Sequence, residues 1–354
     1  MSKLGAYIAG TVGGSILLVL LLVVGLDVIA AIVDELGELR GEYTFTEAAY
    51  FVMLTIPGSI VEYVPLASLI GCLVGMGLLA SNSELIVMRA SGLSLGRLAS
   101  YSFLPVLVIV TGSMLISEFV APSTDNWAKT HKDLRLWGES RSLVSGRSGL
   151  WHREGETFMH FSVVQPGGVL YGVTLFEFRG AEMRRAIAAR RATYSASGWL
   201  LEDVRETQFA ADHLTNSSAN TQLWQSELTP RALNFLANEP DELALRSLAD
   251  YSRYLLAQGL DAMPFRLAFW QKSLQPLAVF SLVLIALSFV FGPLRSATMG
   301  YRVFIGIVVG IAFQFAQNLL GPASLIYGFP PLLAVLAPIG LCAGGGLVML
   351  ARSG

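Results

Sequence analysis

The segment from residue 81 to residue 92 has the most informative spacing in this sequence. Ser81 and Glu84 stand three residues apart, as in a capping box, where each side chain satisfies a free backbone N–H at the start of a helix. Gly92 suits the left-handed residue that ends many helices. The intervening residues include Leu85, Met88 and Arg89. The spacing predicts a short helix that either lies on a lipid surface or docks in a groove of a second protein, where Glu84 would pair with a basic group.

Two lysines form a second candidate site. Lys129 and Lys132 are three residues apart and therefore share a face if this stretch is helical. Two ammonium groups above a membrane cavity would suit the phosphates of a lipid head group. The alternative is an ordinary basic face in contact with water.

Two further charged residues stand at membrane depth. Asp27 lies near the far end of the first apolar segment, and Lys272 lies near the start of the fourth. Ionisable groups inside such segments are functional candidates by default. For Lys272 the alternative is that its long stem lets the ammonium group reach the membrane surface.

Three common motifs for catalysis or metal binding are missing from the sequence. It contains no GxxxxGK[ST] phosphate loop, no HExxH pair and no Cys/His metal cluster. Cys72 and Cys342 each stand in an apolar run and are expected to be small buried hydrophobes. A net charge of −2 gives no reason to expect nucleic-acid binding. We therefore expect no catalytic residue, metal or cofactor in this chain, and an outside energy source such as a cytoplasmic ATPase docking on helix 81–92.

Composition defines the scaffold that must position these residues. Apolar residues make up 53% of the chain and charged residues 14%, against about 25% charged in an ordinary soluble domain. Of the 50 charged residues, 32 lie between residues 122 and 261. The pattern predicts a membrane protein that carries one polar insert.

Six segments are long and apolar enough to cross a membrane as helices. They cover residues 7–33, 48–80, 98–120, 267–291, 303–320 and 330–350. We expect three helices with the coupling segment 81–92 in residues 1–121, an inserted domain in residues 122–261, and three more helices in residues 262–354.

The distribution of basic residues predicts the orientation. The termini and the loops on their side carry one acid, Glu84, and six bases: Lys3, Arg89, Arg97, Arg295, Arg302 and Arg352. The first loop on the other side carries one base, Arg40, and five acids: Asp34, Glu35, Glu38, Glu42 and Glu47. Both termini are therefore predicted to be cytoplasmic and the insert periplasmic.

The insert has the pattern of a β domain. Short runs rich in aromatic and β-branched residues are separated by turn signals. They cover residues 149–153, 157–164, 169–178, 184–194, 199–206 and 221–227. This spacing is typical of a sandwich or jelly roll, and residues 246–258 have the spacing of a helix that leads back to the membrane.

Several motifs together resemble the LptF/LptG family of lipopolysaccharide export permeases. The strongest is the loop 83–92 (SELIVMRASG). The others are 33–36 (VDEL), 65–71 (PLASLIG), 149–151 (GLW), 287–296 (LSFVFGPLRS) and 328–332 (GFPPL). The resemblance extends over the whole chain.

The resemblance implies six transmembrane helices with a periplasmic β-jelly-roll between the third and the fourth. It implies four other components: an LptF-type permease, a dimer of the LptB-type ATPase, the single-span LptC-type protein, and lipopolysaccharide as ligand. Loop 81–92 would be the coupling helix, with Glu84, Leu85, Met88 and Arg89 against the ATPase. Helices 1 and 5 would form lateral gates to a lumen, with Asp27, Phe313 and Gln317 as candidates there. Basic residues above the lumen would meet the lipid's phosphates, and the candidates are Lys129, Lys132, Lys272 and Arg40.

One feature departs from the family pattern. Relatives often carry lysines near the outer end of helix 1 and the start of helix 2, where this sequence has Ala31, Glu38 and Gly58. Either Arg40 or the partner permease would then compensate.

The sequence therefore predicts a non-catalytic permease of the inner membrane of a Gram-negative bacterium, driven by a separate ATPase. Two alternatives come from other classes. An ion-driven transporter would use Asp27, Glu62 and Lys272 near the bilayer midplane. A membrane-anchored periplasmic scaffold would need one span, and six are excessive for it.

Overall fold

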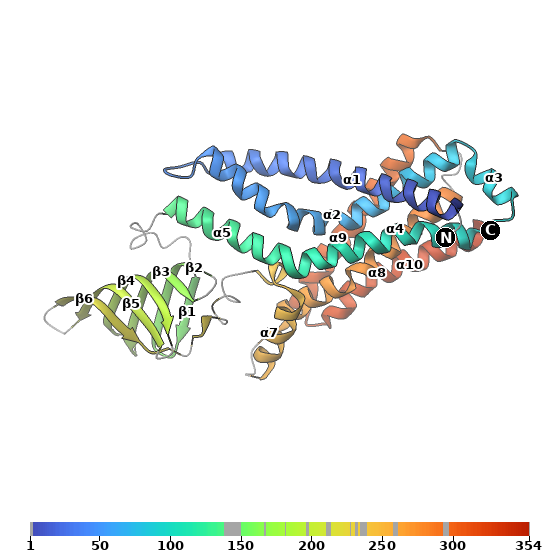
Figure 1. Cartoon of the computed structure of the whole chain (residues 1–354). Coiled ribbons are helices and arrows are strands. Elements are labelled where there is room, and N and C mark those ends of the chain that lie inside the picture. The colour runs from blue at the N-terminus through green and yellow to red at the C-terminus, as the bar shows by residue number, and fades with distance from the viewer. Residues whose placement is uncertain are drawn as a thin grey trace. The chain divides into compact units, whose positions relative to one another are not determined.

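Apolar runs become long helices and the polar insert becomes a sheet in the computed structural model of the chain (Figure 1). The structure describes residues 3–137, 150–165, 168–180, 182–195, 198–209, 214–226, 228–230, 233, 239–257, 261–292 and 297–353. The chain divides into two compact units. The membrane unit comprises Met1–Ala31, Thr55–Pro122 and Ala244–Gly354, and the second unit comprises Ile32–Leu54 and Ser123–Leu243.

Six helices of the described chain are long and apolar enough to cross a membrane, which confirms the predicted multi-pass protein. They are α1 (Lys3–Leu36), α2 (Phe45–Ser81), the continuous helix of α4 (Leu95–Leu115), η1 (Ile116–Val120) and α5 (Ala121–Trp137), then α8 (Met263–Phe291), α9 (Met299–Tyr327) and α10 (Pro331–Ser353). The third predicted segment ended at residue 120, but the helix continues to Trp137. Hydropathy could not find α5 because that stretch is polar.

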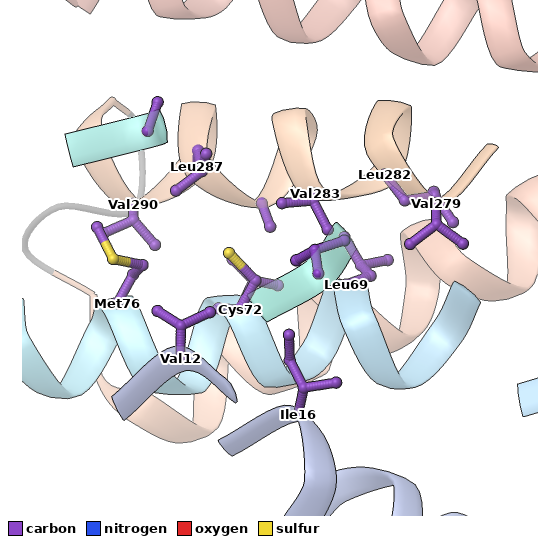
Figure 2. Packing of buried hydrophobic residues seen from close by; sticks show 14 of the residues in the cluster. Val12, Ile16, Leu69, Cys72, Met76, Val279, Leu282, Val283, Leu287 and Val290 are labelled. Carbon is purple, nitrogen blue, oxygen red and sulfur yellow. The ribbon is translucent and has the colours of Figure 1, made fainter. Parts of the chain in front are cut away.

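Helices α2 and α8 form the centre of the membrane unit. In their most apolar stretches 67% of α2 and 61% of α8 are buried, against 17% for α1 and 17% for α9. Figure 2 shows the packing, in which Val12 and Ile16 meet Leu69, Cys72 and Met76 of α2 across from α8. Cys72 is fully buried, as predicted. Helix α2 is thus the element on which the outer helices of this unit are built.

Glycine brings α1 against the backbone of α2. A Cβ on Gly71 would lie 2.4 Å from Cα of Ile16, and one on Gly75 would lie 3.0 Å from Cα of Val12. Small residues at such crossings let helices approach closely in a membrane, where the lipid leaves little hydrophobic drive for association. The position of α1 on α2 is therefore fixed by shape.

In the described part of the insert, six antiparallel strands form a single sheet (Figure 1). They are β1 (Leu150–Glu154), β2 (Thr157–Gln165), β3 (Val169–Arg179), β4 (Glu182–Ser195), β5 (Gly198–Phe209) and β6 (Leu214–Trp224), and they lie in the sheet in that order. The predicted all-β insert is confirmed. Its described strands form a meander of sequence neighbours, and the Greek-key crossovers of a jelly roll are not among their pairings.

The sheet has its own apolar core. Phe161, Leu170 and Trp199 are fully buried, and the Trp199 indole N–H donates to the carbonyl of Leu228 at 2.8 Å. Strand β6 differs from the others, because its side chains from Leu214 to Thr221 are all exposed. That exposure explains why the sequence indicated only its last residues as a strand. The predicted turn at 154–155 is confirmed, with Gly155 at φ 60°, whereas the turns at 165–168 and 195–198 lie partly outside the described residues.

Helix α7 (Leu245–Ala257) matches the predicted helix 246–258. Its first N–H, on Leu245, donates to Oε2 of Glu118 at 2.8 Å. Glu118 lies in the π-helical turn η1. A carboxylate at a helix N-terminus satisfies a free N–H and is favoured by the helix dipole, so Glu118 fixes where α7 begins.

Candidate functional site

The predicted helix in segment 81–92 exists and is shorter than expected. Helix α3 covers Glu84–Ala90. The predicted capping box does not form, because Ser81 still belongs to α2 and its hydroxyl donates to the carbonyl of Leu78 at 2.9 Å. The residue at the N-cap is Ser83, which adopts a left-handed conformation with φ 62° and makes no side-chain cap. A sharp backbone turn therefore separates α2 from α3.

The other end of α3 is as predicted. Gly92 has φ 92°, its N–H donates to the carbonyl of Arg89 at 3.0 Å, and the Leu93 N–H donates to the carbonyl of Met88 at 3.2 Å. This pair of bonds is a Schellman motif. Ser94 then caps α4 by accepting a hydrogen bond from the Arg97 N–H. Helix α3 is thus fixed at both ends.

Residues 92–96 (GLSLG) match the GxSxG spacing of a nucleophile elbow. That motif needs a strand before the serine and a helix after it. Here helix α3 precedes Ser94. Ser94 is the N-cap residue of α4, and its hydroxyl oxygen accepts a hydrogen bond there. The segment is therefore a helix junction.

Helix α3 has an inner and an outer face. Leu85 and Met88 are 5% and 7% exposed and belong to the membrane unit's own core, whereas Ile86 and Val87 are 54% and 67% exposed. The sequence interpretation directed the apolar residues of this helix, Leu85 and Met88 among them, at a second protein. In the structure Leu85 and Met88 are buried within the chain itself, which leaves little of either side chain for a partner. The apolar residues available to a second protein are Ile86 and Val87, beside the exposed Arg89.

A small hollow lies beside α3. Its lining comes from the end of α2, from α3 and from the end of α8, and comprises Ala80, Leu85, Ile86, Arg89, Val290 and Phe291. The fourth predicted residue, Glu84, is partly exposed and lies close enough to Tyr7 of α1 to interact with it electrostatically. The Asn82 amide also approaches its Oε1 at 3.5 Å. Helix α3 therefore contacts α1, α2 and α8 and presents a mixed apolar and charged outer face.

The second predicted site lies on α5, and its lysines are paired with carboxylates of the same unit. Lys129 Nζ pairs with Glu242. Lys132 Nζ lies 2.7 Å from Oε1 of Glu35 and 3.5 Å from Oε2 of Glu38. The Lys132 side chain is 18% exposed. The sequence interpretation treated both lysines as open to a ligand, but each already has an anionic partner.

Aromatic groups enclose the Lys132 pair. Its Nζ lies 4.9 Å from the centroid of Phe51, a cation–π distance. The Tyr43 hydroxyl donates to Oε2 of Glu35 at 2.8 Å. Burial of Tyr43 raises the pKa of its phenol well above the usual value, and the hydrogen bond to Glu35 adds to this rise. Glu35 therefore holds a cation and a phenol at once.

The same pattern continues along α5. His131 pairs with Glu47, and the Arg135 guanidinium lies 3.4 Å from Glu47 and 3.6 Å from Glu42. We call Glu35, Glu38, Glu42 and Glu47 the acidic cluster. In the sequence these acids indicated the orientation, and Glu38 also marked a departure from the family pattern. The excess of acids in this loop beside the excess of bases in residues 129–135 was the signal that could have linked the two segments.

The other predicted site residues are placed separately. Arg40 is exposed in the turn between α1 and α2, where its backbone bridges to Tyr43. Lys272 is partly buried on α8, in the membrane unit. Phe313, a lumen candidate, is 7% exposed and packs in that unit's core. Gln317 is partly buried.

Asp27 is satisfied by hydroxyl groups. Its Oδ2 accepts from Ser59 at 2.7 Å and its Oδ1 accepts from Tyr63 at 2.8 Å. Both donors are on α2, so the carboxylate ties α1 to α2. Among the described residues no group of three His, Cys, Asp or Glu is placed to hold a metal ion. This geometry makes Asp27 a connection between helices.

Comparison with known proteins covers nearly the whole chain. Residues 6–352 match the family described as lipopolysaccharide export system permease LptF/LptG. The lipopolysaccharide export system permease protein LptG of Escherichia coli (strain K12) is 34% identical over 342 residues, which cover 95% of this chain and 94% of that protein. The LptG protein of Haemophilus influenzae is 32% identical over 342 residues, with 96% and 95% covered.

Proposed function

The chain belongs to the LptF/LptG family of lipopolysaccharide export permeases, and from this premise we propose that helix α3 is where a separate ATPase drives it. As a permease of the lipopolysaccharide export system, it is a non-catalytic transmembrane subunit of an ABC transporter. Membership of this system implies partners from the same system. One observation supports α3 as the contact with the ATPase. This helix is buried on the side of Leu85 and Met88 and exposes Ile86 and Val87 on the other side.

The proposed assembly contains this chain, an LptF-type permease, a dimer of an LptB-type ATPase and an LptC-type single-span protein. We place it in the inner membrane of a Gram-negative bacterium, with both termini cytoplasmic. The basic residues at the end of the membrane unit that carries α3 support this orientation. The same orientation makes the β sheet periplasmic. We also propose that residues 1–121, 122–261 and 262–354 act as a helical half, an inserted domain and a second helical half.

In the proposed mechanism the ATPase binds the outer face of α3. Ile86 and Val87 fill an apolar groove, while Glu84 and Arg89 pair with charged groups at its rim. Leu85 and Met88 transmit force, because they are packed into the core formed by α2 and α8. Closure of the ATPase dimer on ATP would push α3, shrink the lumen between the permeases and expel the lipid toward the β sheet.

At the lipid end we propose an exchange of ion pairs. A phosphate that binds Lys129 or Lys132 must replace Glu242 or Glu35 as the anion. Lys129 is the easier to recruit, because its side chain is 45% exposed and Lys132 is 18% exposed. Removing one partner of a buried pair is far more costly than removing one at the surface. Lys272 and Arg40 stay as candidate auxiliary cations.

The ion-driven alternative gains no support from Asp27. Two hydroxyl groups already satisfy its carboxylate. A coupling-ion site near the midplane is expected to have backbone carbonyls or carboxylates directed at the ion. The scaffold alternative does not explain why the match to a permease family extends over all six candidate spans.

The test targets the outer face of α3 in the complete complex. Ile86→Asp and Val87→Asp place a carboxylate in the proposed groove, and Glu84→Ala removes the proposed ion pair. Leu214→Asp is the matched control, because Leu214 is 64% exposed on strand β6. We expect copurification of the ATPase to fall about tenfold in the two Asp variants, which corresponds to a loss of about 1.4 kcal/mol. It should stay unchanged in the control. Normal copurification and transport in all three α3 variants, at normal membrane levels, would show that α3 is not the ATPase contact.

A further inference from the structure

A buried arginine links α9 to the end of α2 that leads into α3. Arg302 lies in the first turn of α9, is 3% exposed, and its Nη1 donates to the carbonyl of Gly77 at 2.8 Å. A guanidinium is always charged, and burial of a charge is unfavourable unless the group is hydrogen-bonded or paired. The position therefore calls for an explanation beyond the filling of space.

Electrostatics at the two helix ends explains part of it. Arg302 lies at the N-terminal, positive end of its own helix, where a cation is disfavoured. Its guanidinium reaches the last turns of α2, which ends at Ser81. The C-terminal end of a helix carries partial negative charge and favours a cation. The charge of Arg302 is thus stabilised by the C-terminal end of α2 and disfavoured by the N-terminal end of α9. The stabilisation is therefore lost if the two helix ends separate.

The guanidinium packs closely over Gly77, so that a side chain at this position would meet it. A Cβ on Gly77 would lie 2.8 Å from Nη1 and 3.3 Å from Cδ of Arg302. Only Asn82 and Ser83 separate the end of α2 from the start of α3. A displacement of α3 is therefore delivered within about one helical turn of the carbonyl that Arg302 holds.

The same face of α9 touches α2 farther along. Gly306 and Gly310 follow Arg302 at intervals of four residues, so all three share one face. A Cβ on Gly306 would lie 2.6 Å from Cδ1 of Leu73, and one on Gly310 would lie 2.3 Å from Cδ1 of Leu66. Along this face α9 packs against α2 through apolar contacts at the two glycines. Arg302 adds a polar contact at the end of α2 that leads into α3.

We propose that Arg302 is a positioning residue that carries the displacement of α3, through the end of α2, into α9. The inference rests on the proposed function in one respect, namely that α3 receives the push of the ATPase. Without the Arg302 connection, α2 would move at its end and slide along the glycine contacts of α9. ATP would then be hydrolysed without the matching movement of α9.

The experiment uses the whole exporter in proteoliposomes that contain lipopolysaccharide. Arg302→Met removes the charge and the donors and keeps the stem. Gly77→Ala keeps the charge and displaces the guanidinium. Arg302→Lys is the conservative variant. Arg97→Met is the matched control, because Arg97 is an exposed arginine at the start of α4.

Three quantities are measured: ATPase copurification, the rate of ATP hydrolysis, and lipopolysaccharide released per ATP. We expect the first two to stay close to wild type. The released lipid per ATP should fall about tenfold in Arg302→Met and Gly77→Ala, within the usual range of coupling between sites. It should recover in part in Arg302→Lys and stay normal in Arg97→Met. A spin label replacing Phe304 on α9, which is 59% exposed, should lose its response to ATP in Arg302→Met.

Two results would overturn the inference. One is normal lipid release per ATP in assembled Arg302→Met. If that variant fails to assemble, normal release per ATP in Gly77→Ala overturns it instead. A failure of the proposed function looks different. In that case the complex with Arg302 unchanged would keep its ATPase in Ile86→Asp and in Val87→Asp.

Discussion

Two regions of this permease hold their functional side chains by different forces. Around α2 and α3 the positions are set by packing, by glycine contacts and by a helix cap, with few charges. Around α5 they are set by ion pairs between the acidic cluster and the basic residues of α5. The first region presents an outer face that needs no rearrangement before a partner binds. The second must break existing pairs before a phosphate can be bound.

The difference fits the roles that we propose for the two regions. A surface that transmits force benefits from rigid contacts, because protein interiors are close-packed and pass strain on. A surface that binds and releases an anion benefits from cations whose alternative partner is near. In the second region carboxylates of the same unit provide that partner, so release of the ligand restores an existing set of pairs.

The largest effect is expected from Glu35→Ala, which tests whether charge pairing holds the second region. The change leaves the ammonium of Lys132 and the hydroxyl of Tyr43 without the carboxylate that both now contact. Glu35 is 8% exposed, and removal of one partner of a buried ion pair costs about 3–5 kcal/mol. Thermal unfolding of the purified complex would measure the loss.

The control for that change is Glu38→Ala in the same cluster. Glu38 is 48% exposed and lies 3.5 Å from the same Lys132 ammonium. An exposed pair contributes about 0–1 kcal/mol, so its loss should be small. Equal effects of the two variants would mean that burial does not distinguish the pairs.

The next largest effect is expected from Gly71→Ala, which tests whether shape holds the first region. The new methyl group would lie 2.4 Å from Cα of Ile16, and a backbone atom cannot yield as a side-chain end can. Overpacking of this kind costs about 1–3 kcal/mol. Resistance of the folded complex to heat or protease is the measurement. Gly14→Ala on α1, where a Cβ would meet nothing within 4 Å, should be neutral, and a neutral Gly71→Ala would contradict the close contact.

The sequence was sufficient for the elements that hydropathy or alternation marks. The six apolar segments are long enough to span a membrane, and the first five strands are runs of β-branched and aromatic residues bounded by turn signals. Gly92 has a local backbone role that needs no tertiary contact. Strand β6 and helix α5 were missed or shortened because exposed polar residues give no such pattern. Their structure depends on neighbours that are distant along the chain.

The candidate site was less predictable for the same reason. Spacing placed a short helix within residues 81–92, but only the packing shows that Leu85 and Met88 are buried and that Ile86 and Val87 are exposed. Likewise the basic face of α5 was visible in the sequence. Its partners in the acidic cluster and at Glu242 are tens of residues away and become neighbours only in the fold.

A smaller effect is expected at the lipid end from Lys129→Ala. If the exposed lysine is recruited first, photocrosslinking to lipopolysaccharide should fall about fivefold, which corresponds to about 1 kcal/mol. Lys132→Gln should lower crosslinking less and unfolding temperature more, because Lys132 is the more buried of the two. The triple variant combines Lys129→Ala, Lys132→Gln and Lys272→Ala. Unchanged crosslinking to lipopolysaccharide in this variant would refute a phosphate-binding role for the three lysines.

The last prediction concerns the pH dependence of the second region. Burial and the bond to Glu35 raise the pKa of Tyr43 in the folded state, whereas the unfolded chain ionises near pH 10. The stabilisation from Tyr43 is therefore complete below about pH 10 and is lost as the pH rises above it, since only the unfolded state then gives up its proton. In Tyr43→Phe this part of the alkaline loss should disappear. Stability near neutral pH should fall by about 1.5–3 kcal/mol, because a hydrogen bond to a charged acceptor is lost. Unfolding temperatures at pH 8 and above pH 10 would show it, with the exposed Tyr50→Phe as the control. The same alkaline slope in wild type and Tyr43→Phe would mean that the phenol does not titrate in this way, and the second region would then depend on its ion pairs alone.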